Sequence, residues 1–118
     1  NFGALEKEYT SIFQRLSNSH LSPSLVMGLA IVHHLHITNF LSFGHIAELF
    51  TKFNSKYLIV EFIPIEDSKV KLLIKNKQKN FTGYTQENFT SALLQYFKLM
   101  EIKKIEGSDR ELLLLEKL

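Results

Sequence analysis

Three histidines within four residues, His33, His34 and His36, are the first candidates for chemistry in this sequence of 118 residues. On an extended segment, His34 and His36 would point to the same side, as two ligands of one metal ion must. The chain has no cysteine, and no carboxylate adjoins the histidines to complete a ligand set. We therefore predict no metal site at this position.

Two other interpretations of the histidines stay open. Buried polar groups are normally paired, so the rings can cap the end of a strand by hydrogen bonding to loop backbone. Ligands of open α/β sheets bind outside the carboxyl ends of the strands, so His33 and His34 can equally contact a substrate. A histidine of ordinary pKa titrates near neutrality, and one of them would then position or deprotonate a nucleophilic substrate atom.

Glu61 is the second candidate, because it interrupts an otherwise apolar run over residues 57–63. A carboxylate in a strand that is buried on both faces is costly unless it is paired or reaches a cleft. The sequence leaves two interpretations, an ion pair with a residue such as Arg110 or a contact with a substrate. Glu66 and Asp67 are expected to begin a helix, where negative charge is favourable.

Two continuous apolar runs are expected to position these side chains. Residues 25–32 lie between Pro23 and the histidines, and residues 57–63 end at Pro64. Runs without polar alternation are typical of strands in a parallel sheet covered on both faces, although a buried helix competes for residues 25–32. His33 and His34 then follow the carboxyl end of the first strand.

Helical spacing of apolar residues predicts four helices around this sheet. They cover residues 3–16, residues 46–53, a lysine-rich segment after Asp67, and a segment that begins at the N-cap Thr85. The phenylalanines of these segments are assigned to the core: Phe50, Phe53, Phe89 and Phe97. The lysines of the third helix are expected to face water.

The end of the chain predicts a β-hairpin, with strands over residues 99–105 and 111–118 joined by a turn. Leucine occupies positions 112–115 without interruption, so both faces of the last strand should be buried and the strand should lie inside the sheet. Alternation of strands and helices predicts a parallel sheet in a three-layer α/β/α arrangement, with residues 1–118 forming one domain.

Composition narrows the class of protein. Hydrophobic residues make up 45% and charged residues 22%, which is typical of a folded domain. The net charge of +2 gives no reason to expect nucleic acid or a membrane surface as partner. No apolar stretch approaches a membrane span, no secretory signal is present, and the absence of cysteine is compatible with a cytoplasmic protein. The chain begins at Asn1, which suggests a fragment.

Four segments carry a resemblance to a known family: residues 29–35 (LAIVHHL), 59–64 (IVEFIP, followed by Glu66 and Asp67), 84–89 (YTQENF) and 107–110 (GSDR). Together they resemble the C-terminal part of class I S-adenosylmethionine-dependent methyltransferases of the nodulation-protein-like group, over nearly the whole chain. The resemblance implies half of a Rossmann-like sheet. Its strands would be the fourth to seventh, with the last one antiparallel and inserted beside the fifth.

The same resemblance implies a function. The longer protein of which this chain would be the C-terminal half, here called the parent, would transfer a methyl group from S-adenosylmethionine to an unknown acceptor. This half would supply the substrate side of the active-site cleft. Its five glycines form neither GxGxxG nor GxG, so this chain alone should not bind the cofactor tightly. The candidate site residues are His33 and His34 for catalysis, Glu61, Pro64, Tyr84 and Arg110 for substrate binding, and Leu29 and Ala30 for cofactor binding.

The alternative is a non-catalytic interaction module built on the same half sheet. In both cases the strand over residues 25–32 would have an unpaired edge, and the neighbouring helices would have an uncovered apolar face. We therefore expect a homodimer, or the missing N-terminal half of the parent, to cover them.

Overall fold

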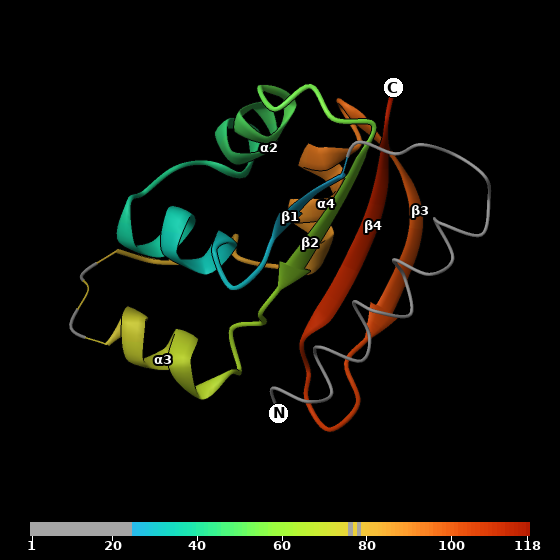
Figure 1. Cartoon of the computed structure of the whole chain (residues 1–118). Helices are drawn as coiled ribbons and strands as arrows, with labels where there is room; N and C mark the ends of the chain where they lie inside the picture. The colour runs from blue at the N-terminus through green and yellow to red at the C-terminus, as the bar shows by residue number, and fades with distance from the viewer. Residues whose placement is uncertain (1–24, 76, 78) are drawn as a thin grey trace.

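A computed structural model describes residues 25–75, 77 and 79–118 of the chain (Figure 1). Within them an α/β fold is built on one four-stranded sheet in the order β1-β2-β4-β3. The strands are β1 (Leu25–Gly28), β2 (Tyr57–Phe62), β3 (Phe97–Lys104) and β4 (Glu111–Lys117). The helical elements are η1 (His34–Thr38), α2 (Phe43–Thr51), α3 (Ser68–Ile74) and α4 (Gln86–Leu93). The helix predicted over residues 3–16 lies outside the described part.

The sheet is mixed, as the sequence predicts. β1 and β2 are parallel, with Leu25 opposite Tyr57 and Gly28 opposite Val60. β4 is antiparallel to both β2 and β3, and it lies between them (Figure 1). The last strand of the chain is therefore an interior strand rather than an edge strand.

The four leucines of β4 explain this position. Their exposed fractions are 0–8%, and alternate side chains join two different apolar clusters. Leu113 and Leu115 pack on the face that α2 and α4 cover, whereas Leu112 and Leu114 pack with Ile59 on the opposite face. The prediction that both faces of this strand are buried is confirmed.

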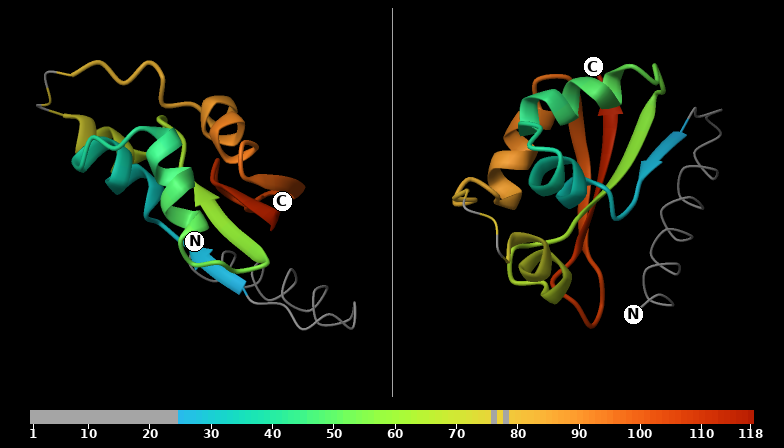
Figure 2. Two further views of the ribbon diagram at one scale, coloured as in Figure 1. Left: turned by 90° about the horizontal axis from the view of Figure 1, so that it is seen from above. Right: turned by 90° about the vertical axis from the view of Figure 1, so that its left-hand side faces the viewer.

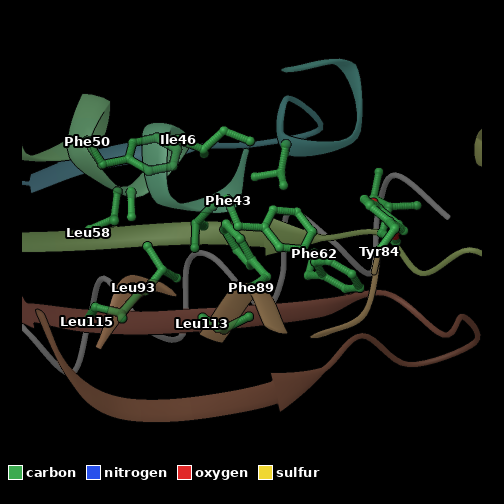
Figure 3. Packing of buried hydrophobic residues seen from close by; sticks show 14 of the residues in the cluster. Phe43, Ile46, Phe50, Leu58, Phe62, Tyr84, Phe89, Leu93, Leu113 and Leu115 are labelled. Atoms are coloured by element: carbon green, nitrogen blue, oxygen red, sulfur yellow. The ribbon is translucent and has the colours of Figure 1, made fainter. Parts of the chain in front are cut away.

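The main core lies between the sheet and two helices, α2 and α4, which cover the same face (Figure 2). Its side chains interdigitate across this layer, as Figure 3 shows for Phe43, Ile46 and Phe50 of α2, Phe89 and Leu93 of α4, and Leu58 and Phe62 of β2.

The N-cap hydrogen bonds of α4 and α3 join residues that are close together in the sequence. The Thr85 hydroxyl accepts a hydrogen bond from the Asn88 N–H at 3.1 Å, and the Asp67 carboxylate accepts one from the Lys69 N–H at 2.8 Å.

The first strand is shorter than predicted. β1 ends at Gly28, Ala30 adopts a left-handed φ of 53°, and Val32 already begins the helical turn that leads into η1. Val32 is fully buried in the core from this helical position. The strand prediction for residues 29–32 is therefore wrong, because an unbroken apolar run suits a buried helical turn as well as a strand.

The prediction that four phenylalanines lie in the core is wrong for one of them, Phe53. Phe50, Phe89 and Phe97 are at most 7% exposed, but Phe53 is 62% exposed. α2 ends at Thr51, so Phe53 follows the helix instead of continuing its buried face. Leu49, which does lie on α2, is 44% exposed. The apolar stripe of α2 is thus covered on one side only.

Among the described helices, none combines the length and the apolar character needed to cross a bilayer.

Replacing Leu113 with alanine should lower the free energy of unfolding by about 2–5 kcal/mol, because the substitution leaves a cavity beside the main core. Leu72→Ala is the matched control: Leu72 is 70% exposed on α3, and its loss should cost less than about 0.5 kcal/mol. Urea denaturation followed by circular dichroism measures both. Equal losses for the two variants would contradict the interior position of β4.

Candidate functional site at the carboxyl ends of β1 and β2

The carboxyl ends of the parallel strands β1 and β2 lie at the same edge of the sheet, and most of the predicted site residues follow them. The loop after β1 carries Leu29, Ala30 and the histidines, and Pro64 follows β2. Arg110 directly precedes β4, which is the antiparallel neighbour of β2, so its side chain reaches this edge too. The topology therefore gathers residues that are far apart in the sequence.

Glu61 is fully buried at the end of β2. Its Oε1 atom accepts a hydrogen bond from the Ala30 N–H at 2.8 Å, while Oε2 has no hydrogen-bond partner within the described part of the chain. Burial raises the pKa of Glu61, and the Ala30 N–H and the charge of Arg110 oppose this change. The carboxylate therefore holds the loop that follows the neighbouring strand.

The ion pair suggested for Glu61 is formed by a different carboxylate. Arg110 Nε lies 3.1 Å from Asp67 Oδ2, and both side chains are largely buried. Burial alone would raise the pKa of Asp67, but the Lys69 N–H and the Arg110 guanidinium outweigh it and hold the pKa below its usual value. Asp67 thus caps α3 and binds Arg110, a second role that its helix-start pattern did not indicate.

His33 is the buried histidine of the site, with 4% of its surface exposed. Its ring centroid lies 4.2 Å from that of His34, and its Nδ1 atom lacks a hydrogen-bond partner among the described residues. Burial, assisted by His34, Arg110 and Lys69 and opposed by Asp67, lowers the pKa of His33 to about 4. The imidazole is therefore neutral at neutral pH, where it can take part in hydrogen bonds but is a weak proton acceptor.

His34 and His36 do not point to the same side, because the segment that carries them is helical rather than extended. Both lie in the helical turn η1, where residues two apart face in nearly opposite directions. His34 is exposed, whereas His36 Nδ1 is 2.8 Å from the Leu41 carbonyl oxygen and its ring stacks on Phe43 at 4.4 Å. Throughout the described residues, no group of three or more His, Cys, Asp or Glu side chains could hold a metal ion.

Tyr84, a predicted substrate-binding residue, is buried and held by contacts with β2 and the segment that follows it. It is 1% exposed, its ring stacks on Phe62 at 5.0 Å, and its hydroxyl donates a hydrogen bond to the Ile63 carbonyl (Figure 3). Burial raises the pKa of Tyr84, and the carboxylates of Asp67 and Glu61 raise it further. The tyrosine therefore stays protonated and fixes the chain that leaves β2.

A cavity of about 230 Å³ adjoins this segment. Pro64 and Tyr84, both predicted to bind substrate, line it together with three carboxylates that the sequence analysis did not select as site residues: Glu66, Glu87 and Glu111. Burial raises the pKa of Glu111, Glu87 adds to this change, and Lys104 opposes it. These carboxylates come from three separate segments, so no spacing in the sequence could have grouped them.

The structure thus divides the predicted residues into two groups. His33 and Glu61 lie near the Asp67–Arg110 ion pair. The charges of Asp67 and Arg110, together with that of Lys69, affect the pKa values of both residues. Pro64 and Tyr84 line the cavity, and the exposed residues Leu29 and Ala30 form the loop surface. The arrangement offers neutral hydrogen-bonding groups and proton acceptors, while its guanidinium is already paired.

Comparison with known proteins finds one relevant similarity. The chain is similar to nodulation protein NoeA of Rhizobium meliloti (strain 1021), with 32% identity over 100 residues that make up 85% of this chain and 21% of NoeA. The chain therefore spans about a fifth of the length of this relative. No family model and no solved structure matches the chain. The similarity supports the nodulation-protein-like part of the resemblance.

The lowered pKa of His33 should make the stability of the protein depend on pH. Between about pH 6.5 and pH 4 the unfolded chain binds a proton at His33 that the folded chain does not, so the free energy of unfolding should fall as the pH decreases. The expected loss from this residue is about 1–3 kcal/mol. Urea denaturation at several pH values checks this, with His33→Gln as the variant that cannot titrate. Identical pH dependence in both proteins would contradict the assignment.

Proposed function

We propose that this chain is the C-terminal, substrate-side half of an S-adenosylmethionine-dependent methyltransferase and that it is inactive alone. One observation carries the proposal, the insertion of the antiparallel last strand β4 between β2 and β3. In class I methyltransferases the seventh strand is antiparallel and lies beside the fifth. In this proposal β1 and β2 are the fourth and fifth strands of the family sheet, β3 is the sixth and β4 is the seventh. The spatial order β1-β2-β4-β3 then matches the family order.

The similarity to nodulation protein NoeA adds support for the narrower group, because it covers 85% of this chain at 32% identity. The similar region is a small part of NoeA. The activity of the whole protein therefore belongs to the proposal.

The position of the site also supports a substrate-side role. Ligands of open α/β sheets bind outside the carboxyl ends of the parallel strands, where His33, Glu61 and the cavity beside Tyr84 lie. Methyl transfer depends mainly on alignment of the acceptor atom with the sulfonium methyl group that the cofactor supplies. In this proposal Pro64 and Tyr84 shape the acceptor site, and neutral His33, with His34 beside it, orients the acceptor atom by hydrogen bonding.

The residues of this chain do not fit a complete cofactor site. No glycine-rich turn occurs among its five glycines. In this proposal the exposed residues Leu29 and Ala30, which follow β1, contribute contacts to the cofactor. Arg110, which would otherwise be free to bind an anionic substrate, is held by Asp67. The remaining cofactor contacts must come from another part of the parent.

A second candidate function, a non-catalytic interaction module, is favoured by an apolar groove beside β1. The groove has a volume of about 330 Å³ and combines residues of β1, the loop after it and α2. Met27, Ile31, Leu49 and Phe53 line it and are 40–62% exposed. In the parent we expect the N-terminal half to cover this groove, and in the isolated chain we expect a second copy to do so.

Isothermal titration of this chain with S-adenosylhomocysteine tests the methyltransferase proposal. We expect no tight complex, with a dissociation constant weaker than about 1 mM, because the glycine-rich turn is missing. A longer chain that contains this sequence together with the upstream part of the parent should bind in the micromolar range or better. Tight binding by the present chain alone, or none by the longer one, would contradict the proposal.

Light scattering tests the coverage of the groove. The isolated chain should form a dimer at high concentration, and Leu49→Glu or Phe53→Glu should convert it to a monomer, because burial of a charge in an apolar interface is costly. Leu72→Glu is the control, since Leu72 is similarly exposed on α3 but does not line the groove. A well-behaved monomer of the unmodified chain would count against the dimer.

A further inference from the structure

The side chain of Glu61 connects two segments that are 31 residues apart. Oε1 accepts a hydrogen bond from the Ala30 N–H at 2.8 Å. Ala30 has a φ of 53°, in the left-handed region that costs an L-amino acid free energy. A backbone conformation of this kind persists only where surrounding contacts hold it, and the hydrogen bond from Glu61 is such a contact.

The turn at Ala30 decides where the following residues lie. Leu29 and Ala30 are exposed, whereas Val32 and His33 are at most 4% exposed. The chain therefore changes from an exposed loop to a buried helical turn within three residues of the Glu61 contact. His34, whose ring centroid is 4.2 Å from that of His33, is placed by the same turn.

We propose that Glu61 is a positioning residue, which holds residues 29–33 through the Ala30 N–H and thereby places His33 and His34 at the carboxyl end of β1. The importance of that place rests on the proposed function. The positioning itself is a property of the described loop and does not depend on methyl transfer.

The other contacts of Glu61 agree with this role. Arg110 is paired with Asp67, so Glu61 is not a member of that ion pair. The second carboxylate oxygen has no partner in the described part of the chain, which leaves the bond to Ala30 as the polar contact that orients the side chain. Since a protonated carboxyl group keeps a carbonyl oxygen, this contact survives protonation of Glu61.

Titration of the histidine rings by NMR, on the full chain, tests the proposal. The charged and titratable groups that act on His33 are His34, Asp67, Lys69 and Arg110, and none of them is altered. In Glu61→Ala, release of the loop should expose His33 and raise its midpoint from about 4 toward 6.5, by at least about one pH unit. Glu61→Gln keeps an oxygen that can accept the Ala30 N–H, so its midpoint should stay near that of the unmodified chain.

Two further variants make the test specific. Ala30→Gly in the Glu61→Ala background should return the midpoint part of the way, because glycine adopts a positive φ without the same cost. Glu116→Ala, near the opposite end of β4, should leave the His33 titration unchanged. A folded Glu61→Ala protein whose His33 midpoint matches that of the unmodified chain would overturn the proposal.

Hydrogen exchange in the unmodified chain covers the case in which Glu61→Ala does not fold. The Ala30 amide should exchange at least about tenfold more slowly than the same amide in an unstructured chain of this sequence, because its N–H is bonded to Glu61. Exchange of the Ala30 amide at the unstructured rate would overturn the proposal. Neither readout involves the cofactor, so failure of the cofactor test and failure of this one are distinguishable.

Discussion

The insertion of β4 between β2 and β3 is the constraint on which the remaining structure depends. The backbone of β4 pairs with both neighbours, and its leucines fill apolar clusters on both faces of the sheet. At an edge of the described sheet, the backbone of β4 would pair with one neighbour instead of two. By placing the end of the chain beside β2, this insertion also brings Arg110 to Asp67, 43 residues away, at the edge where the site lies.

Competition between buried charges shapes the site. Asp67 pairs with Arg110, and within the described residues Glu61 binds only the Ala30 N–H. Burial raises the pKa of Glu61, although Arg110 still opposes this change. The same burial lowers the pKa of His33. Burial thus favours the neutral form of both groups, and the edge of the sheet offers a neutral imidazole for hydrogen bonding rather than a fixed charge.

The apolar groove leaves one side of α2 and the edge strand β1 uncovered in the described part of the chain. α2 packs its Phe43, Ile46 and Phe50 into the core but leaves Leu49 exposed next to β1, which is an edge strand of the described sheet. A face of this kind is stabilised when another surface removes it from water. A partner surface, either a second copy of the chain or the N-terminal half that the proposed function requires, would do so.

Local rules account for what could be predicted from the sequence alone. Unbroken apolar runs located β2 and β4, the spacing of aromatic residues located α4, and Thr85 and Asp67 act as the N-caps that their residue types suggested. These features depend on neighbours within a few residues, so the sequence determined them directly.

Only the tertiary structure decided the rest. The early end of β1 at Gly28, the burial of His33, the exposure of Phe53 and the choice of Asp67 over Glu61 by Arg110 each depend on segments far apart in the chain. An apolar run cannot distinguish a strand from a buried helical turn, and a charged residue cannot indicate which opposite charge it will meet. Those outcomes are set by which surfaces the packed sheet brings together, because burial and hydrogen-bond geometry exist only after folding.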